Sequence, residues 1–154
     1  NGKRNHDEIR FWQDYIDKDK GSYIYDDEGN KGSLGDESFV IIGDLNASPN
    51  EGDAINSGIQ NLLHHPRVND NFTPSSKGGK RSSPDNPNGK YHTASWKLRA
   101  DYVLPSTDLK VSDHGIFWPT KGEPLHELML DREASSDHRM VWVTIGTNDK
   151  KPSN

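Results

Sequence analysis

The apolar residues of this chain fall into short, separate runs, and the sharpest run leads directly into an acidic turn. From Phe39 to Asp53 the sequence is FVIIGDLNASPNEGD, where four apolar residues precede Gly43 and Asp44. A short apolar run of this kind predicts a strand that is buried on both faces, and the Gly-Asp pair marks where the backbone leaves the sheet. We therefore expect Asp44 and Asn46 at the end of this strand, on one face. Water, a metal ion or a ligand must reach polar groups placed there, although an ordinary turn, with both side chains bonded to local backbone, explains the pair more simply when it is considered alone.

The first segment with helical spacing lies near the start of the chain. Between Asn5 and about Lys18, Ile9, Trp12 and Ile16 fall on one face, and two further aromatic residues lie on a neighbouring face. Asn5 can cap the helix, and Glu8 three residues later completes a pattern like a capping box. We therefore predict a helix that begins at Asn5.

A second helix is predicted after the strand that ends near Asp44, with Asp53 as its N-cap and Pro66 as its stop signal. His64 and His65 close this helix, and we interpret them as helix-end cations because no carboxylate lies at metal-ligand spacing beside them. Its apolar residues have the spacing i, i+4, i+7, i+8, which is typical of a stripe that faces a core: Ile55, Ile59, Leu62 and Leu63.

Three later segments have the pattern of strands: Leu98 to Ser106, Leu109 to Phe117, and Met140 to Ile145. Asp101 lies inside the first of them, and because aspartate is a poor strand former its presence there indicates a specific purpose. Asp137 precedes the last of them by a few residues. Acidic side chains are therefore expected next to several strands.

The segment Thr73 to Lys90, TPSSKGGKRSSPDNPNGK, is rich in serine, glycine and proline, which predicts a long exposed loop that does not pack. It holds four basic residues and one acidic residue, so it is locally basic in an acidic chain. A solvated linker and a flap that contacts an anion explain this composition equally well. In the second interpretation, Lys77, Lys80 and Arg81 bind the substrate.

Composition narrows the possible classes of protein. Only 29% of the 154 residues are hydrophobic, so either the loops are long and polar or the chain is part of a larger fold. The net charge of -5 argues against a generally basic nucleic-acid binder, but not against an enzyme that reaches phosphate through metal ions. The absence of cysteine excludes disulfide and thiolate chemistry, and no apolar run approaches the roughly 18 residues of a membrane span. Because the chain opens without methionine, we expect a fragment or a processed product, which leaves open a lost leader and a secreted or periplasmic location.

Three acidic residues, Asp44, Asp101 and Asp137, are expected at strand ends or just before strands, each near an amide or an imidazole. This set suits hydrolysis of phosphate esters. One carboxylate can bind a hard cation such as Mg²⁺, a second can orient or deprotonate water, and an imidazolium held by a buried carboxylate can stabilise charge on phosphorus. Ser136, Asp137 and His138 also permit a serine hydrolase, but no Gly-x-Ser-x-Gly elbow occurs. An ordinary surface histidine is the simplest alternative for His138.

Three motifs, GDLNASP, RADYVLPS and SSDHRMVWV, occur in this order. Together they resemble the three C-terminal motifs of the endonuclease/exonuclease/phosphatase superfamily, the fold of pancreatic-type deoxyribonuclease. The flanking segments RNHDEIRFW, YIYDDEGNKG and GIFWP resemble a bacterial, often exported, branch of it. The resemblance runs from about Asn5 to Ile145. It implies an α+β fold in which two mixed sheets pack face to face as a two-layer β-sandwich flanked by helices.

The resemblance also implies a role for each matching residue. Asp44 would position or activate the attacking water, and Asn46 would bond a phosphate oxygen or that water. Asp101 would hold His138 protonated and aimed at the scissile phosphate. Asp137 would bind the metal or its water shell, where the cofactor would be Mg²⁺ or another divalent cation such as Mn²⁺ or Ca²⁺.

The N-terminal half of the superfamily's domain has no counterpart in the sequence. That half carries an early asparagine, a metal-binding glutamate and a second catalytic histidine, none of which can be placed here. We therefore expect residues 1–146 to be the C-terminal half of a domain about twice as long, followed by a polar tail at residues 147–154. The missing N-terminal half would then be a partner without which the chain is inactive or nearly so.

These observations favour a metal-dependent hydrolase of phosphate esters, foremost a phosphodiesterase or nuclease whose substrate is a phosphate ester such as nucleic acid. A phosphomonoesterase or a lipid-headgroup phosphodiesterase is an alternative, because one fold serves several phosphate esters. A non-catalytic fragment that acts as a binding piece is another.

Overall fold

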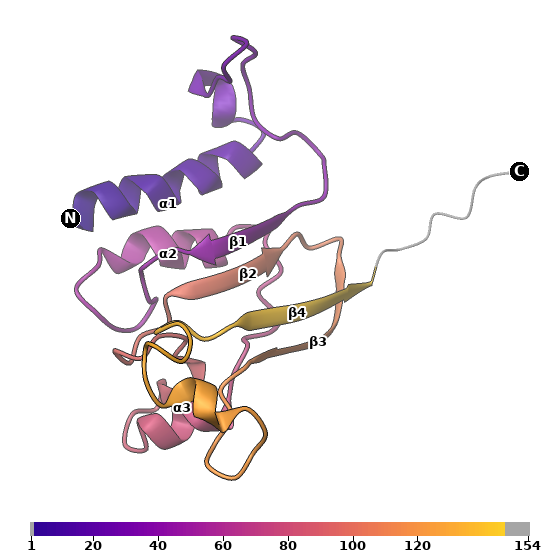
Figure 1. Cartoon of the computed structure of the whole chain (residues 1–154). Helices are drawn as coiled ribbons and strands as arrows, with labels where there is room; N and C mark the ends of the chain where they lie inside the picture. Colours follow the sequence, from indigo (N-terminus) through magenta and orange to yellow (C-terminus); the bar gives the residue numbers. More distant parts are fainter. Residues whose placement is uncertain (1, 147–154) are drawn as a thin grey trace, which may run out of the picture.

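Figure 1 shows the computed structural model of the chain, which describes residues 2–146. The predicted polar tail at residues 147–154 lies outside this range. Helices and antiparallel strands are mixed along the chain, which confirms the α+β class. The elements in order are α1 (Gly2–Ile16), η1 (Gly21–Tyr23), β1 (Val40–Asp44), α2 (Asn56–Leu63), α3 (Lys77–Ser82), η2 (Gly89–Tyr91), β2 (Asp101–Pro105), β3 (Lys110–Ile116), η3 (His126–Met129) and β4 (Val141–Gly146). None of the helices in the described range is long and apolar enough to cross a membrane.

The strands form two antiparallel pairs, β1 with β2 and β3 with β4. Strand β4 lies beside β2, so the two pairs follow one another in a single layer (Figure 1). Within residues 2–146 the pairs do not pack face to face, and the two-layer sandwich therefore stays a prediction. The register of the first pair sets Asp44 opposite Asp101, at the end of β1 and the start of β2.

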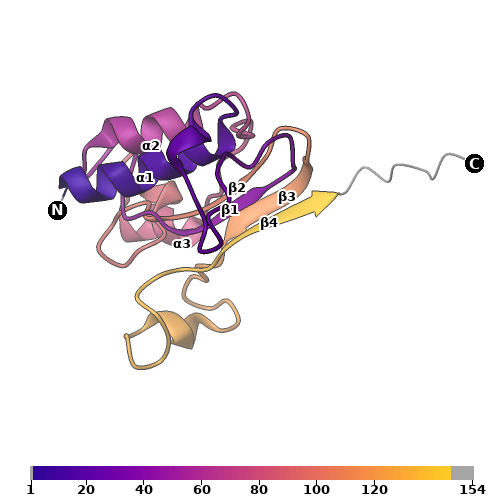
Figure 2. The ribbon, with the colours of Figure 1, turned by 90° about the horizontal axis from the view of Figure 1, so that it is seen from above.

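Helices α1 and α2 cover one face of the β1–β2 pair, as the view from above shows (Figure 2). The core between helices and strands is built from fully or almost fully buried side chains, including Ile9, Ile59, Leu62, Ile41 and Tyr102. The apolar spacing thus predicted the buried positions of Ile9, Ile16, Ile59 and Leu62, whereas Ile55 of the predicted stripe lies outside the helix and is exposed.

The predicted N-cap of α1 is wrong. The helix begins at Gly2, so Asn5 lies inside its first turns. Its side-chain amide donates a hydrogen bond of 2.9 Å to the carbonyl of Leu45, just after β1. Asn5 therefore ties the helix to the loop after the strand instead of starting the helix.

The predicted N-cap of α2 is also wrong. The backbone remains extended at Ile55, which occupies the cap position without a side-chain hydrogen bond, and the helix begins three residues after Asp53. Ile55 is correspondingly 42% exposed. The end of the helix at Leu63, shortly before Pro66, is confirmed.

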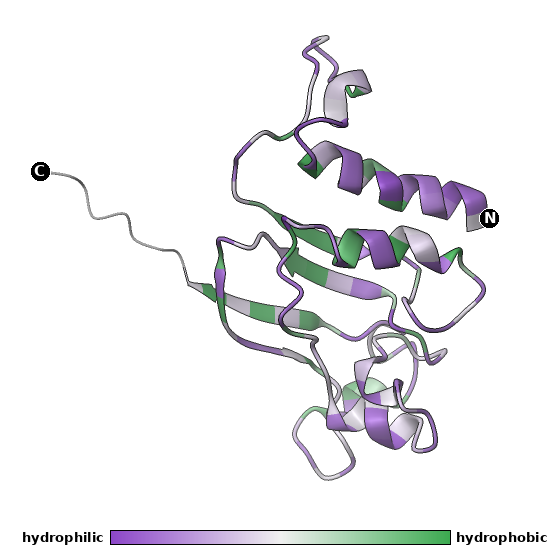
Figure 3. Cartoon of the chain, turned by 180° about the vertical axis from the view of Figure 1, so that it is seen from behind, coloured by the Kyte–Doolittle hydropathy of each residue, from purple (hydrophilic) through white to green (hydrophobic). Residues whose placement is uncertain are grey.

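Strand β1 is not buried on both faces, contrary to the prediction. Ile41 faces the helices and is 4% exposed, whereas Ile42 points to the other face and is 71% exposed. Apolar residues follow one another along β1 (Figure 3), so both of its faces carry apolar side chains, although only one face is covered by described residues. Alternation within the strand decides which of two equally apolar neighbours is buried.

The segment predicted as an unpacked loop, residues 73–90, is folded. It contains α3 and η2, which pack on each other, and Gly78, Gly79 and Gly89 are buried. A Cβ atom on Gly79 would lie 2.6 Å from the carbonyl oxygen of Gly89, and one on Gly78 would collide with the backbone of Trp118. The glycines therefore permit close backbone packing here, which a composition-based prediction of a loop does not detect.

Candidate active site

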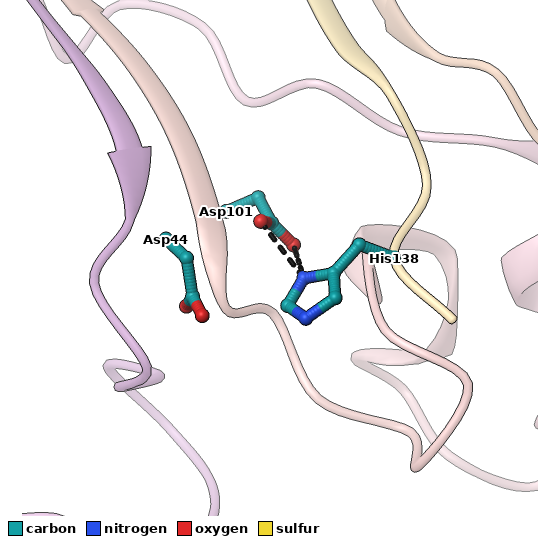
Figure 4. Close-up of side chains that lie close together, drawn as sticks. All are labelled: Asp44, Asp101 and His138. Carbon is teal, nitrogen blue, oxygen red and sulfur yellow. Dashed lines mark hydrogen bonds and ion pairs between the residues drawn. The ribbon is translucent and has the colours of Figure 1, made fainter. Parts of the chain in front are cut away.

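Three side chains that are far apart in the sequence meet at one edge of the strand layer (Figure 4). Asp44 is the last residue of β1 and Asp101 is the first of β2, and antiparallel pairing sets them opposite each other. His138 precedes β4, which lies beside β2. One ligand atom from each of the three residues lies within 4.8 Å of the others. The register of β1 and β2 thus brings the two carboxylates together, and the segment before β4 adds the imidazole.

Asp101 and His138 form a close hydrogen-bonded pair. The Nδ1 atom of His138 lies 3.0 Å from Oδ1 and 2.9 Å from Oδ2 of Asp101. An ionised carboxylate can only accept, so Nδ1 carries the hydrogen and donates it. The other ring nitrogen, Nε2, lies on the side of the ring away from Asp101 (Figure 4). This nitrogen is therefore the one that can meet a ligand.

The surroundings of His138 favour its protonated form. Partial burial lowers the pKa of the imidazole, but the hydrogen bond to Asp101 and the negative charges of Asp101, Asp44 and Asp137 outweigh this effect. The net result is a pKa raised above the ordinary value of 6.5. His138 can therefore carry a positive charge closer to neutral pH than an isolated histidine.

Asp44 is exposed, and one of its carboxylate oxygens accepts the backbone N–H of Asn46 at 2.7 Å. Asn46 has a φ of 45°, in the left-handed region, so the chain turns sharply after the strand. The two residues therefore do not share one strand face, which corrects the prediction. The side chain of Asn46 instead lines a neighbouring cavity of about 410 Å³ together with Asn5 and Trp96.

The cluster opens into a cavity of about 460 Å³. Asp44, Asp101 and His138 line its polar end. The rest of its lining is mostly apolar and comes from the uncovered face of the strands and from the segment before β4: Ile42, Val103, Phe117, Leu128, Met129, Met140 and Val141. A charged group at the edge of an apolar surface is the arrangement expected where a ligand or another part of a protein completes the site.

Asp137 lies next to His138 but does not join the cluster. Its carboxylate is 3.3 Å from the guanidinium of Arg132, and its backbone carbonyl accepts the N–H of Ser95 at 2.8 Å. It acts on the cluster through its charge, which contributes to the raised pKa of His138. Its role as a metal ligand stays a prediction.

Of the three residues in the cluster, one rather than all three is suited to bind a divalent metal ion. The oxygens of Asp101 already accept hydrogen bonds from His138 and Thr93, and a protonated imidazole has no lone pair to offer. Mg²⁺ prefers oxygen ligands and is usually held by one or two carboxylates, water and substrate phosphate. Asp44, whose carboxylate is exposed, is the residue of the cluster that suits this role.

The predicted substrate-binding residues on α3 do not line the cavity at the cluster. The ammonium group of Lys80 donates to the carbonyl of Pro84 at 2.7 Å. Lys77 and Arg81 act on Glu123, whose pKa is lowered first by hydrogen bonds from Thr120 and further by these two positive charges. Contact of these residues with a substrate stays a prediction.

Two residues beside the cluster carried no functional signal in the sequence. The hydroxyl of Thr93 donates to Oδ2 of Asp101 at 2.7 Å. The ring of Trp96 meets the imidazole of His138 edge-on, with 4.9 Å between centroids, and Trp96 is 47% exposed. Both lie in the segment just before β2, and their closeness in sequence to Asp101 is the one available hint.

Residues 5–138 match the model of the Endonuclease/Exonuclease/phosphatase family. The matched span contains Asp44, Asp101 and His138 and covers most of the described chain. No curated protein and no solved structure matches the chain.

Proposed function

The chain belongs to the endonuclease/exonuclease/phosphatase family, and from this premise we propose that it forms part of the active site of a metal-dependent phosphodiesterase, foremost a nuclease. Members of the family are mostly hydrolytic enzymes that act on phosphate esters, including nucleic acids, and typically use divalent metal ions. The observation that carries the proposal is the hydrogen-bonded pair of Asp101 and His138 facing the exposed carboxylate of Asp44.

In this proposal His138 is the cationic group that meets the phosphate. Asp101 holds the ring through Nδ1, so that Nε2–H of the imidazolium is directed toward the ligand. A fixed, partly buried positive charge stabilises the negative charge that develops on phosphate oxygens when water attacks. The raised pKa of His138 favours this charge up to a higher pH than in an isolated histidine.

Asp44 acts on the attacking water. Water forms a bond to phosphorus while a carboxylate within hydrogen-bond reach accepts the water proton. The bond to one ester oxygen breaks, and that oxygen leaves with the electron pair and takes up a proton from solvent, which gives an alcohol. Asp44 is exposed and its nearest ligand atom lies within 4.8 Å of the other two groups, so one phosphate can be within reach of all three. A bound divalent cation would supply charge neutralisation of the phosphate, with Asp44 as one of its ligands. In the same proposal, Asn46 contacts the phosphate or the attacking water. Asp137 belongs to the shell of the metal ion.

Trp96 favours a diester with a base or another flat group over a simple monoester. Its exposed ring lies directly beside His138, and Lys97 follows it at the tip of the same turn. Aromatic side chains stack on nucleobases with a gain of about 1–3 kcal/mol per base, and a lysine can meet an adjacent phosphate. A nuclease is therefore preferred to a phosphomonoesterase or to a lipid-headgroup phosphodiesterase.

The uncovered apolar face supports a further part of the proposal, that these residues are the C-terminal half of the domain. Ile42 is 71% and Met140 62% exposed, and both line the cavity at the cluster. Covering a large aliphatic side chain is worth about 1.5–3 kcal/mol. A second sheet from the N-terminal half of the same domain is the occupant we propose, because it would bury this face and bring the asparagine, glutamate and histidine that the family resemblance assigns to that half.

The test compares the full-length protein that contains this chain with residues 1–154 alone, both with Mg²⁺. The substrates are plasmid DNA, bis(4-nitrophenyl) phosphate and 4-nitrophenyl phosphate. We expect the full-length protein to cleave the two diesters faster than the monoester, Asp44→Asn to lower the rate by about 10²-fold or more, and the isolated chain to be inactive or nearly so. Faster cleavage of the monoester would contradict the diesterase, and full activity of the isolated chain would contradict the half-domain.

A further inference from the structure

Thr93 lies between η2 and β2 and is 1% exposed. Its hydroxyl makes three hydrogen bonds, all to the start of β2. The backbone N–H groups of Ala100 and Asp101 donate to Oγ1 at 2.9 Å and 3.0 Å. Oγ1 lies 2.7 Å from Oδ2 of Asp101. The hydroxyl is therefore saturated, and every partner belongs to Asp101 or to its neighbour.

These contacts determine the direction of the hydroxyl hydrogen. A threonine hydroxyl has two lone pairs and one hydrogen. Two N–H donors use both lone pairs, so the hydrogen must point to the carboxylate of Asp101. That carboxylate is thus fixed by a donor on one side and by the imidazole of His138 on the other.

The backbone of Thr93 is tied to the segment that carries His138. Its carbonyl accepts the N–H of Arg139 at 2.6 Å, and Ala94 pairs with His138 in an isolated antiparallel bridge. Thr93 thus holds Asp101 through its side chain and the His138 segment through its main chain. No other described residue is bonded to both in this way.

The preceding residue anchors Thr93 from behind. His92 is fully buried, with Nε2 at 3.1 Å from Glu51 and Nδ1 at 3.4 Å from the hydroxyl of Ser83. Glu51 belongs to the loop that follows β1, and Ser83 is the C-cap of α3. The segment that presents Thr93 is therefore held by two other parts of the fold and has little freedom to shift.

We propose that Thr93 is a positioning residue of the active site, which fixes the rotation of the Asp101 carboxylate and thereby the orientation of His138. This inference rests on the proposed function, because it assigns Thr93 a role in that same site. It acts through Asp101 and touches no substrate. Its loss should therefore lower kcat and leave KM nearly unchanged.

The test uses Thr93→Val, which keeps the shape and removes the hydroxyl, and Thr93→Ser, which keeps the hydroxyl, in the full-length protein. A displacement of about 1 Å in a catalytic group can cost about 10²-fold, so we expect Thr93→Val to lower kcat by about tenfold or more with KM within about threefold. Thr93→Ser should restore kcat to within about threefold of the wild type. Rates are divided by the folded fraction, because Thr93→Val also leaves two buried N–H groups unpaired.

Thr120→Val is the matched control. Thr120 is 7% exposed and its hydroxyl also donates to a carboxylate, that of Glu123 at 2.8 Å, but it does not line the cavity at the cluster. We expect this variant to lose stability while kcat is unchanged. Equal loss of kcat in Thr120→Val and Thr93→Val, or an equal loss in Thr93→Ser and Thr93→Val, would overturn the proposal.

A second readout does not depend on turnover. The Nδ1–H proton of His138 is bonded to Asp101 and can be followed by NMR through its exchange with water. We expect at least about tenfold faster exchange in Thr93→Val, since the carboxylate is no longer fixed, and wild-type exchange in Thr93→Ser and Thr120→Val. Unchanged exchange in Thr93→Val would overturn the role of Thr93. Absence of any hydrolysis by the wild type would overturn the proposed function, while the exchange measurement would still decide about Thr93.

Discussion

Two histidine–carboxylate pairs in this molecule have similar geometry and opposite surroundings. His92 lies 3.1 Å from Glu51 and its side chain is 0% exposed, whereas His138 lies 2.9 Å from Asp101 and its side chain is 30% exposed. Both nitrogens of His92 have partners within the protein. In contrast, Nε2 of His138 lies on the side of the ring away from Asp101 (Figure 4), and His138 lines the cavity at the cluster.

The difference indicates that a hydrogen-bonded histidine–carboxylate pair alone would not make the catalytic site proposed above. The pair of His92 and Glu51 joins the loop after β1 to the segment that contains α3 and η2, which is a structural task. The pair of His138 and Asp101 has an open nitrogen and a second acidic group, Asp44, close to it. Access to a ligand, rather than the hydrogen bond itself, separates a functional histidine from a structural one.

The largest expected effect separates the two pairs by activity. His138→Ala in the full-length protein should lower kcat for a diester by about 10²–10⁴-fold, the range typical of a catalytic acid–base or charge-stabilising group. Steady-state kinetics with bis(4-nitrophenyl) phosphate measures this, and circular dichroism checks that the variant is folded. A loss of less than about tenfold would remove His138 from the proposed mechanism.

The next effect separates the pairs by stability. His92→Ala should lower the free energy of unfolding by about 2–4 kcal/mol, because it leaves a cavity and removes the buried partner of Glu51. His64→Ala is the control, since His64 is exposed at the end of α2 and its loss should change stability by less than about 0.5 kcal/mol. Urea unfolding measures both variants. Equal stability of His92→Ala and His64→Ala would show that the buried pair has no structural role.

The smallest effect is the dependence of stability on pH. Because the pKa of His138 is raised above 6.5 in the folded protein, its protonation stabilises the fold. This contribution is fully present below pH 6.5 or so, and it is lost as the pH rises through the folded pKa. The measurement is the difference in unfolding free energy between wild type and His138→Gln from about pH 5 to 9. This difference separates the contribution of His138 from that of His65, whose pKa is lowered by burial. A difference that grows as the pH rises would contradict the sign.

The raised pKa of His138 also predicts where activity falls on the alkaline side of the pH profile. If the imidazolium is the active form, kcat/KM for the diester should fall at a pH above the ordinary histidine value of 6.5. The limb should be missing in the residual activity of His138→Gln. A rise of kcat/KM with pH through this region would instead indicate that the neutral ring is the active form.

Local pattern predicted much of the fold. The strand that ends at Asp44, a strand around Asp101 and most of the apolar positions of the two helices were expected, because alternation and helical period are properties of neighbouring residues. The second strand starts at Asp101 instead of at Leu98, and Ile55 is exposed. The ends of elements were less well predicted. Both predicted N-caps, Asn5 and Asp53, are displaced, since the start of a helix depends on contacts outside it, such as the bond from Asn5 to Leu45.

The sequence by itself determined which residues carry charge and chemistry, and its ordered motifs singled out Asp44, Asp101 and His138. Only the tertiary structure decided how they are placed: the antiparallel register that sets Asp44 opposite Asp101, the glycine contacts that fold residues 73–90, and the position of Thr93 behind the carboxylate. The physical reason is that a motif records side-chain type along one segment, whereas the distance between groups depends on strand pairing and on backbone contacts between segments that are remote in sequence.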